Sequence, residues 1–206
     1  GGTTPTTPPT FTPLPTAISL SDANLNFASL GETQQLSATV RDQNGSAMTG
    51  ASVSWATSDA SVATVSSAGL VNAASNGTAT ITVTSGSASA TASATVAQVA
   101  ASVELIHTEL TFTSFGETHQ LDFTVKDAND HVISAATVTW SSSDNTVATV
   151  SSEGLVTAGA IGTATITGTS GSASATASVT VQEEAATLPD TEIDSGPATG
   201  STQRES

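Results

Sequence analysis

Two ten-residue stretches decide the fold. Val62–Val71 reads VATVSSAGLV and Val147–Val156 reads VATVSSEGLV, so they differ at one position in ten. The second stretch lies 85 residues after the first, and the same offset relates Trp55 to Trp140. Self-similarity at a fixed offset without a gap indicates that one structural unit has been duplicated. We therefore expect two copies of one small domain, in which shared features serve the fold.

Each copy has the pattern of β-structure. Val, Ile and Thr are abundant, Gly, Asn, Asp and Ser punctuate the chain, and no long stripe with a helical period appears. The stretch Ser87–Val96 alternates polar and apolar residues, as expected of an antiparallel strand with one wet face. Short strands at this spacing predict a sandwich. In the first copy we predict strands at 16–20, 25–28, 34–41, 51–57, 61–65, 69–73, 77–84 and 87–97, and in the second copy 85 residues later.

The expected domains are 17–97 and 102–182, joined by residues 98–101. A four-residue linker reaches only about 14 Å, so the domains should stack end to end. Residues 1–16 contain five prolines and predict an extended, stiff arm, and residues 183–206 are acidic and predict a disordered tail. The chain begins with Gly1-Gly2 rather than Met, so we expect a processed product or a fragment.

Composition excludes several functions. The net charge is −15, from 18 acidic and 3 basic residues, and so few cations cannot neutralise a phosphate backbone or an anionic membrane. With no cysteine, the chain forms no disulfides and offers no thiolate. We find no apolar run long enough for a transmembrane helix.

The second copy carries the fullest form of a recognisable pattern. It reads Val138-Thr139-Trp140-Ser141-Ser142-Ser143-Asp144, then Val147-Ala148-Thr149-Val150, Gly154-Leu155-Val156 and Gly162-Thr163-Ala164-Thr165-Ile166. This pattern resembles the bacterial immunoglobulin-like domain, group 2, and the first copy matches it over most of the same positions. The resemblance implies an all-β fold of two tandem immunoglobulin-like β-sandwiches, here with extended N- and C-terminal tails. It also implies an extracellular or cell-surface protein without enzymatic activity.

We expect a core without disulfides, held by apolar burial between the sheets. One tryptophan per copy lies mid-strand, where immunoglobulin-like sandwiches bury such a residue. The predicted core residues are Trp55, Trp140, Val65, Val150, Leu70, Leu155, Ile81 and Ile166.

The residues point away from catalysis. His107, His119 and His131 all lie in the second copy and are interpreted as exposed polar variation, since no Ser/His/Asp arrangement repeats. Lys126 is the only lysine, and its counterpart is Arg41, so we reject an isopeptide crosslink.

Calcium is the one cofactor that the sequence raises. Asp127, Asn129 and Asp130 offer several oxygen ligands within one turn. The set is short of the six to eight oxygens that calcium takes, so we expect no cofactor and keep these three residues as weak calcium candidates.

The leading functional hypothesis is a structural protein of the bacterial cell surface: a stalk, an adhesin segment or a fibre subunit. The alternatives are an adhesin module that binds a glycan or a host protein, and a tail or decoration protein of a phage virion. Phe11 and Leu14 are the apolar residues of the arm, so we predict that the arm anchors on a neighbouring copy and builds a homo-oligomer or fibre. A lipid anchor on a residue upstream of Gly1 is a further hypothesis, which would make the chain a lipoprotein.

Overall fold

The computed structural model describes residues 12–183, and within that range all regular elements are β-strands. The first domain contains β1 (Pro15–Leu20), β2 (Asn24–Phe27), β3 (Thr33–Gln35), β4 (Ala38–Asp42), β5 (Ser54–Thr57), β6 (Ala63–Val65), β7 (Leu70–Ala73), β8 (Gly77–Ser85) and β9 (Ala88–Val96). The second contains β10 (Ser102–Leu105), β11 (Glu109–Phe112), β12 (Thr118–Gln120), β13 (Phe123–Lys126), β14 (Thr139–Ser142), β15 (Ala148–Val150), β16 (Leu155–Ala158), β17 (Gly162–Ser170) and β18 (Ala173–Val181). The predicted all-β class and the tandem arrangement are confirmed.

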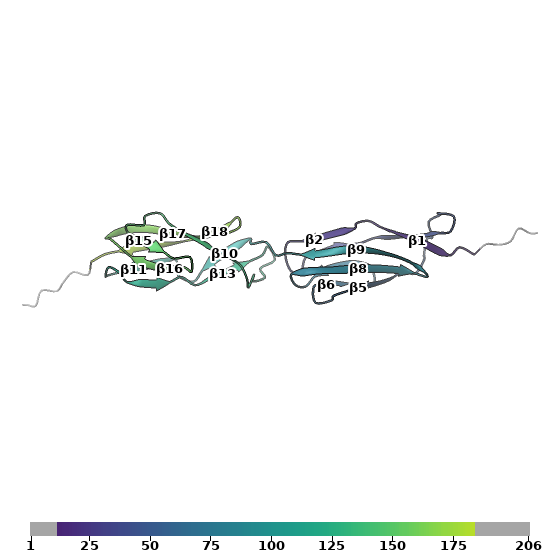
Figure 1. The fold of residues 1–206 in the computed structure, drawn as a ribbon, viewed down its shortest axis with the longest axis horizontal. Coiled ribbons are helices and arrows are strands. Elements are labelled where there is room, and N and C mark those ends of the chain that lie inside the picture. The colour runs from purple at the N-terminus through teal and green to yellow at the C-terminus, as the bar shows by residue number, and fades with distance from the viewer. Residues whose placement is uncertain (1–11, 184–206) are drawn as a thin grey trace, which may run out of the picture.

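Each domain pairs a four-stranded sheet with a three-stranded sheet and a two-stranded ribbon. The orders are β2-β9-β8-β5, β3-β7-β6 and β1-β4 in the first domain, and β11-β18-β17-β14, β12-β16-β15 and β10-β13 in the second. The β2–β9 and β11–β18 pairs are parallel and the other pairs are antiparallel. The two sandwiches lie end to end along the long axis of the molecule (Figure 1).

The core follows the period-two alternation of the long strands. In β8, Ala79, Ile81 and Val83 face inward and are at most 1% exposed, while Thr78 and Thr80 face solvent. Ile81 and its counterpart Ile166 are fully buried, and burying a side chain of this size contributes about 2 kcal/mol. Each core is therefore a layer of small and branched side chains between the sheets, with one buried phenylalanine, Phe27 or Phe112.

The predicted strand 34–41 is wrong as a single strand. It divides into β3 and β4, which belong to different sheets. Leu36 lies at the break, is 1% exposed, and donates its backbone N–H to the Gly69 carbonyl at 2.9 Å. The chain turns Leu36 into the core there as it crosses between sheets. The predicted strand 51–57 is also too long, since β5 begins at Ser54.

Leu70 and Leu155 are not core residues, and their assignment is corrected. Leu70 is 41% exposed and Leu155 is 38% exposed, whereas the next residues, Val71 and Val156, are fully buried. Successive side chains of a strand point to opposite faces, so only one residue of each Leu-Val pair can enter the core. The register places the smaller valine inside.

Trp55 and Trp140 are half-buried and pack against the edges of their cores, as do Val65 and Val150. The Trp55 ring covers Gly69, where a Cβ would lie 2.9 Å from Cζ2 of the ring. Gly69 also has φ of 83°, which only glycine adopts readily. The Gly-Leu-Val motif therefore provides a flat backbone under the indole.

Candidate functional site at the domain junction

The contact between the two domains is built around one turn of the second domain. The turn follows β13 and runs from Asp127 to His131, closed by the Asp127 N–H to the His131 carbonyl at 2.9 Å. Oδ1 of Asp127 accepts the N–H groups of Asn129 and His131, both at 3.0 Å. Asp130 has φ of 63°, a conformation that Asp tolerates better than most residues. These bonds fix the turn and leave the second carboxylate oxygen free to face the first domain.

The first domain receives this turn on the loop 28–32. Oε2 of Glu32 accepts the N–H groups of Ala28 at 2.9 Å and Ser29 at 3.4 Å. The Gly31 N–H reaches the Ala73 carbonyl at 2.8 Å, with Gly31 at φ of 72°. The loop is thereby held so that Leu30 presents its backbone to the second domain.

Three hydrogen bonds join the two surfaces. Oδ2 of Asp127 accepts the Leu30 N–H and the Gln98 side-chain amide, each at 2.9 Å. The Asn129 amide donates to the Leu30 carbonyl at 2.8 Å. Gln98 is oriented by Asn76, whose Oδ1 accepts the Gln98 N–H at 2.8 Å and whose Nδ2 donates to the Gln98 Oε1 at 3.0 Å. Asp127 thus connects its own turn, the linker and the first domain.

Asp127 is 1% exposed, and the pKa of its carboxyl reflects the balance of two effects. Burial raises the pKa, whereas hydrogen bonds from Gln98, Leu30, His131 and Asn129 lower it, and the net result is a pKa of about 2. A buried charge is tolerated where donors compensate the lost hydration. The junction is therefore built for the ionised form of Asp127.

Acid should weaken the junction. An aspartate that titrates near 3.9 in the unfolded chain and at about 2 when folded contributes stability above about pH 4, and that contribution is lost as the pH falls through 2. We expect the melting temperature of the second domain to fall more steeply between pH 4 and 2 than that of an Asp127→Asn variant, which does not titrate at this position. Calorimetry across this range tests the expectation. Parallel acid profiles for the two proteins would contradict it.

The calcium candidates are engaged in protein hydrogen bonds. Both oxygens of Asp127 accept N–H donors, and the Asn129 amide donates to Leu30. Asp130 is exposed. Within residues 12–183, no group of three or more His, Cys, Asp or Glu side chains is placed to hold a metal ion. A calcium ion would have to displace several of the Asp127 donors.

Millimolar calcium should therefore leave the melting temperature within about 2 °C of its value in chelator. The physical reason is that ligand binding stabilises a fold only where it binds the folded state better than the unfolded one. A melting scan with calcium and then with excess chelator measures this. A reversible rise of more than about 5 °C would show a site that these residues do not reveal.

The histidines behave differently from the prediction in one case. His107 and His131 are exposed, but His119 is half-buried, and its Nε2 is shielded from solvent and has no hydrogen-bond partner among residues 12–183. The His107 and His119 rings meet edge to face at 4.9 Å. The interpretation of His119 as exposed is wrong, because its strand turns it toward the neighbouring ring.

Lys126 pairs with Glu104 at 2.7 Å across the β10–β13 ribbon.

Sequence reasoning placed the domains end to end but missed the residues that join them. Leu30 acts through its backbone, which has no sequence signature, and Gln98 is a linker residue without a matching counterpart, because Glu183 takes that place in the second copy. The usable signal was Asp127 itself, because Asp42 repeats it.

Phe11, one of the two proposed anchors, lies outside the described residues. Leu14 is 60% exposed and donates its N–H to Oε1 of Gln43, in its own domain, at 3.0 Å.

The family follows from two matches along the chain. The pattern of the bacterial Ig-like domain (group 2) matches residues 16–96 and again residues 101–181. The chain belongs to this family. Both matches coincide with the two sandwiches, so the predicted resemblance is confirmed.

Several proteins and solved structures are similar to the chain. Ice-binding protein 1 of Shewanella frigidimarina (strain NCIMB 400) is 34% identical over 171 residues, which covers 82% of this chain and 19% of that protein. The chain thus spans about a fifth of the relative's length. Domains 1–6 of the surface layer protein SbsC are 23% identical, with a TM-score of 0.41, covering 83% of this chain and 28% of that one. Drosophila N-cadherin EC1-4 is 13% identical, with a TM-score of 0.42, covering 82% and 50%.

Proposed function

We propose that this chain is a non-enzymatic structural segment of a bacterial surface or extracellular protein, acting as a stiff stalk or adhesin spacer. The observation that carries the proposal is the junction, where Asn129 and the buried Asp127 make two hydrogen bonds to the first domain and one to the linker. Inter-domain motion is the default for tandem domains with small contacts, so a hydrogen-bonded lock of this kind serves a spacer whose length must be maintained.

The family and the surface chemistry support the same proposal. Group 2 bacterial Ig-like domains match residues 16–96 and 101–181 of the chain. Among residues 12–183, no helix is long and apolar enough to cross a membrane. The outward positions of β8 and its neighbour β9 carry Thr and Ser, which suits a solvated shaft. Attachment through a lipid and growth into a fibre through the N-terminal arm remain predictions, because residues 1–11 lie outside the described range.

A distance measurement between the two domains tests the stalk. The chain has no cysteine, so Thr80→Cys and Thr165→Cys place one spin label on the exposed face of each domain at matching positions. Double electron–electron resonance spectroscopy should give one narrow distribution of the distance between the two labels in the otherwise unchanged chain. A broad distribution would mean that the domains swing freely, and the stalk proposal would fail.

A further inference from the structure

The two outer ends of the described chain carry the separate halves of the internal junction. At the far end of the second domain, the loop 113–117 repeats the receiving loop 28–32. Oε2 of Glu117 accepts the Thr113 N–H at 3.1 Å, as Glu32 does for Ala28. The Gly116 N–H reaches the Ala158 carbonyl at 2.8 Å, and Gly116 has φ of 78°. The backbone of Phe115 therefore stands where Leu30 stands in the junction.

The other half lies at the outer end of the first domain. Oδ1 of Asp42 accepts the N–H groups of Asn44 and Ser46, both at 2.9 Å, in the same arrangement as in the turn of Asp127. Gly45 takes the positive φ, 78°, that Asp130 takes in the second domain. Among residues 12–183, no donor reaches the second oxygen of Asp42, whereas that of Asp127 accepts two. Asn44 is exposed, with its amide free to donate as Asn129 does.

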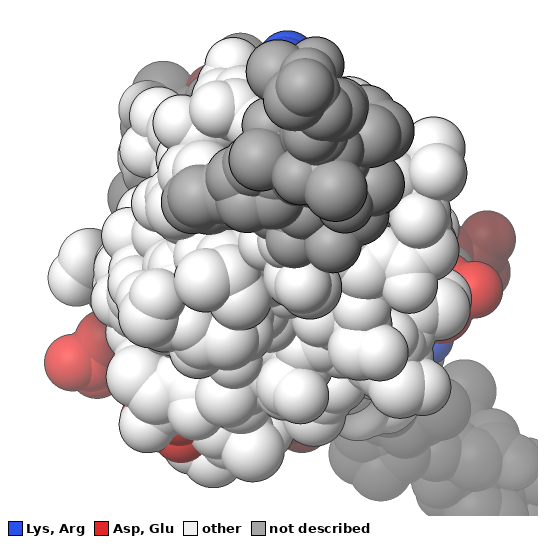
Figure 2. Space-filling model, turned by 90° about the vertical axis from the view of Figure 1, so that its right-hand side faces the viewer, with Lys and Arg blue, Asp and Glu red and all other residues white. Residues whose placement is uncertain are grey.

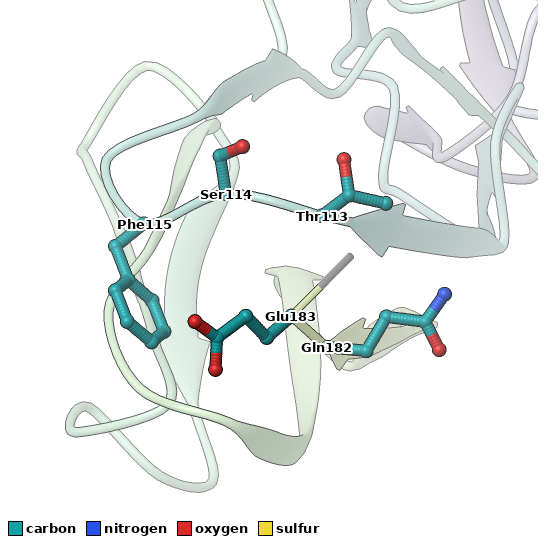
Figure 3. A pocket seen from close by; sticks show the side chains of 5 residues that line it. All are labelled: Thr113, Ser114, Phe115, Gln182 and Glu183. Atoms are coloured by element: carbon teal, nitrogen blue, oxygen red, sulfur yellow. The ribbon is translucent and has the colours of Figure 1, made fainter. Parts of the chain in front are cut away.

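The receiving end also has a pocket, lined by Thr113, Ser114, Phe115, Gln182 and Glu183 (Figure 3). Phe115 is 60% exposed and Ile161, at the position of Asn76, is 58% exposed. At the opposite end, the part of the face that Figure 2 shows uncovered carries few Lys, Arg, Asp or Glu side chains. Leu14 is 60% exposed there and bonds to Gln43 of the turn. Exposed apolar side chains at both ends favour contact over solvation.

We propose that the pocket end of one copy of this chain binds the Asp42–Ser46 turn of a second copy, and that Glu183 sets the strength of this contact. The expected bonds run from the Phe115 N–H to the free oxygen of Asp42 and from the Asn44 amide to the Phe115 carbonyl. This inference goes beyond the proposed stalk, which stands whether or not copies associate.

At Glu183, a side-chain donor of the internal junction is replaced by a carboxylate. Glu183 occupies the position of Gln98, whose amide donates to Asp127 in the internal junction. A carboxylate there offers no donor at neutral pH and repels the carboxylate of Asp42. The contact between wild-type copies should therefore keep the two bonds to the Phe115 N–H and carbonyl. It should lack the bond that Gln98 makes in the internal junction. A heterologous contact of this kind propagates head to tail unless its rotation closes a ring.

Sedimentation equilibrium of the full chain tests the proposal. The buffer contains 0.3 M salt, at which the Debye length is about 6 Å, so that repulsion between distant charges is screened. Glu183→Gln restores the donor of the internal junction and should lower the Kd for association at least about tenfold, because one hydrogen bond is gained and one repulsion is removed. Glu153→Gln removes an exposed acid in the turn before β16 and is the matched control. It should leave the Kd within about twofold of wild type.

A second substitution identifies the surface. Adding Asn44→Ala to Glu183→Gln removes one donor without touching the Asp42 bonds that hold the turn, because those come from backbone N–H groups. It should return the Kd to the wild-type value or above. The proposal is overturned if Glu183→Gln associates no more tightly than Glu153→Gln, or if its association is insensitive to Asn44→Ala.

Discussion

Replacing Asp127 by Ala should release the two domains from each other and destabilise the second domain by about 2–3 kcal/mol. Four N–H donors lose their acceptor: the turn amides of Asn129 and His131, the Leu30 N–H and the Gln98 side chain. Leaving buried donors unsatisfied costs roughly 1–3 kcal/mol each, reduced where water enters. The same change removes the carboxylate that links linker and loop, so the interdomain distance distribution should broaden.

Asp42→Ala is the matched control for this result. Asp42 closes the equivalent turn with the same two backbone N–H groups but makes no bond to the other domain. Its loss should lower the stability of the first domain by about 1 kcal/mol and leave the distance between labels at positions 80 and 165 unchanged. Calorimetry resolves the stability of each domain, and spin-label distances report the junction. If Asp127→Ala keeps the narrow distribution, contacts other than the Asp127 hydrogen bonds hold the domains and the assigned role of Asp127 is wrong.

The fold was accessible from sequence because its determinants are periodic. Alternation in β8 and β9 places Ile81 inward and Thr80 outward, and the 85-residue offset doubles every such signal. Alternation alone does not say which face of a short strand is buried, so the sequence does not distinguish Leu70 from Val71 as the core residue. Strand β7 is four residues long and follows a glycine. Side-chain hydrophobicity favours Leu70 as the core residue, whereas the pairing of the strand turns Val71 inward.

The residues of the junction could not be predicted from the sequence, for a different reason. Asp127 suggests a calcium site because the carboxylate of a turn can either bind a metal ion or accept hydrogen bonds from N–H groups. The choice between them depends on whether donors from elsewhere in the chain converge on it. Here the converging groups are a main-chain amide at Leu30, 97 positions away, and a linker amide at Gln98. Backbone donors leave no trace in composition or spacing, so only the folded arrangement identifies Asp127 as the centre of a contact between domains.

Trp140→Ala should destabilise the second domain by about 3 kcal/mol while leaving the first unchanged. The indole is half-buried, packs against the core of its domain, lies over Gly154 and Gly168, and meets the Phe123 ring edge to face at 5.8 Å. Truncation removes this area and leaves a cavity whose glycine floor cannot refill it.

A loss of this size should lower the melting temperature of an 80-residue domain by more than about 10 °C. Trp55→Ala should do the same to the first domain, so each variant is the other's control, and calorimetry of both gives two transitions that shift one at a time. Trp140→Phe should recover part of the loss because it retains an aromatic ring against Phe123. A shift below about 3 °C for either alanine variant would mean that the indoles lie on the sandwich surface without holding the sheets together, and stability would then rest on the fully buried aliphatic layer around Ile81 and Ile166.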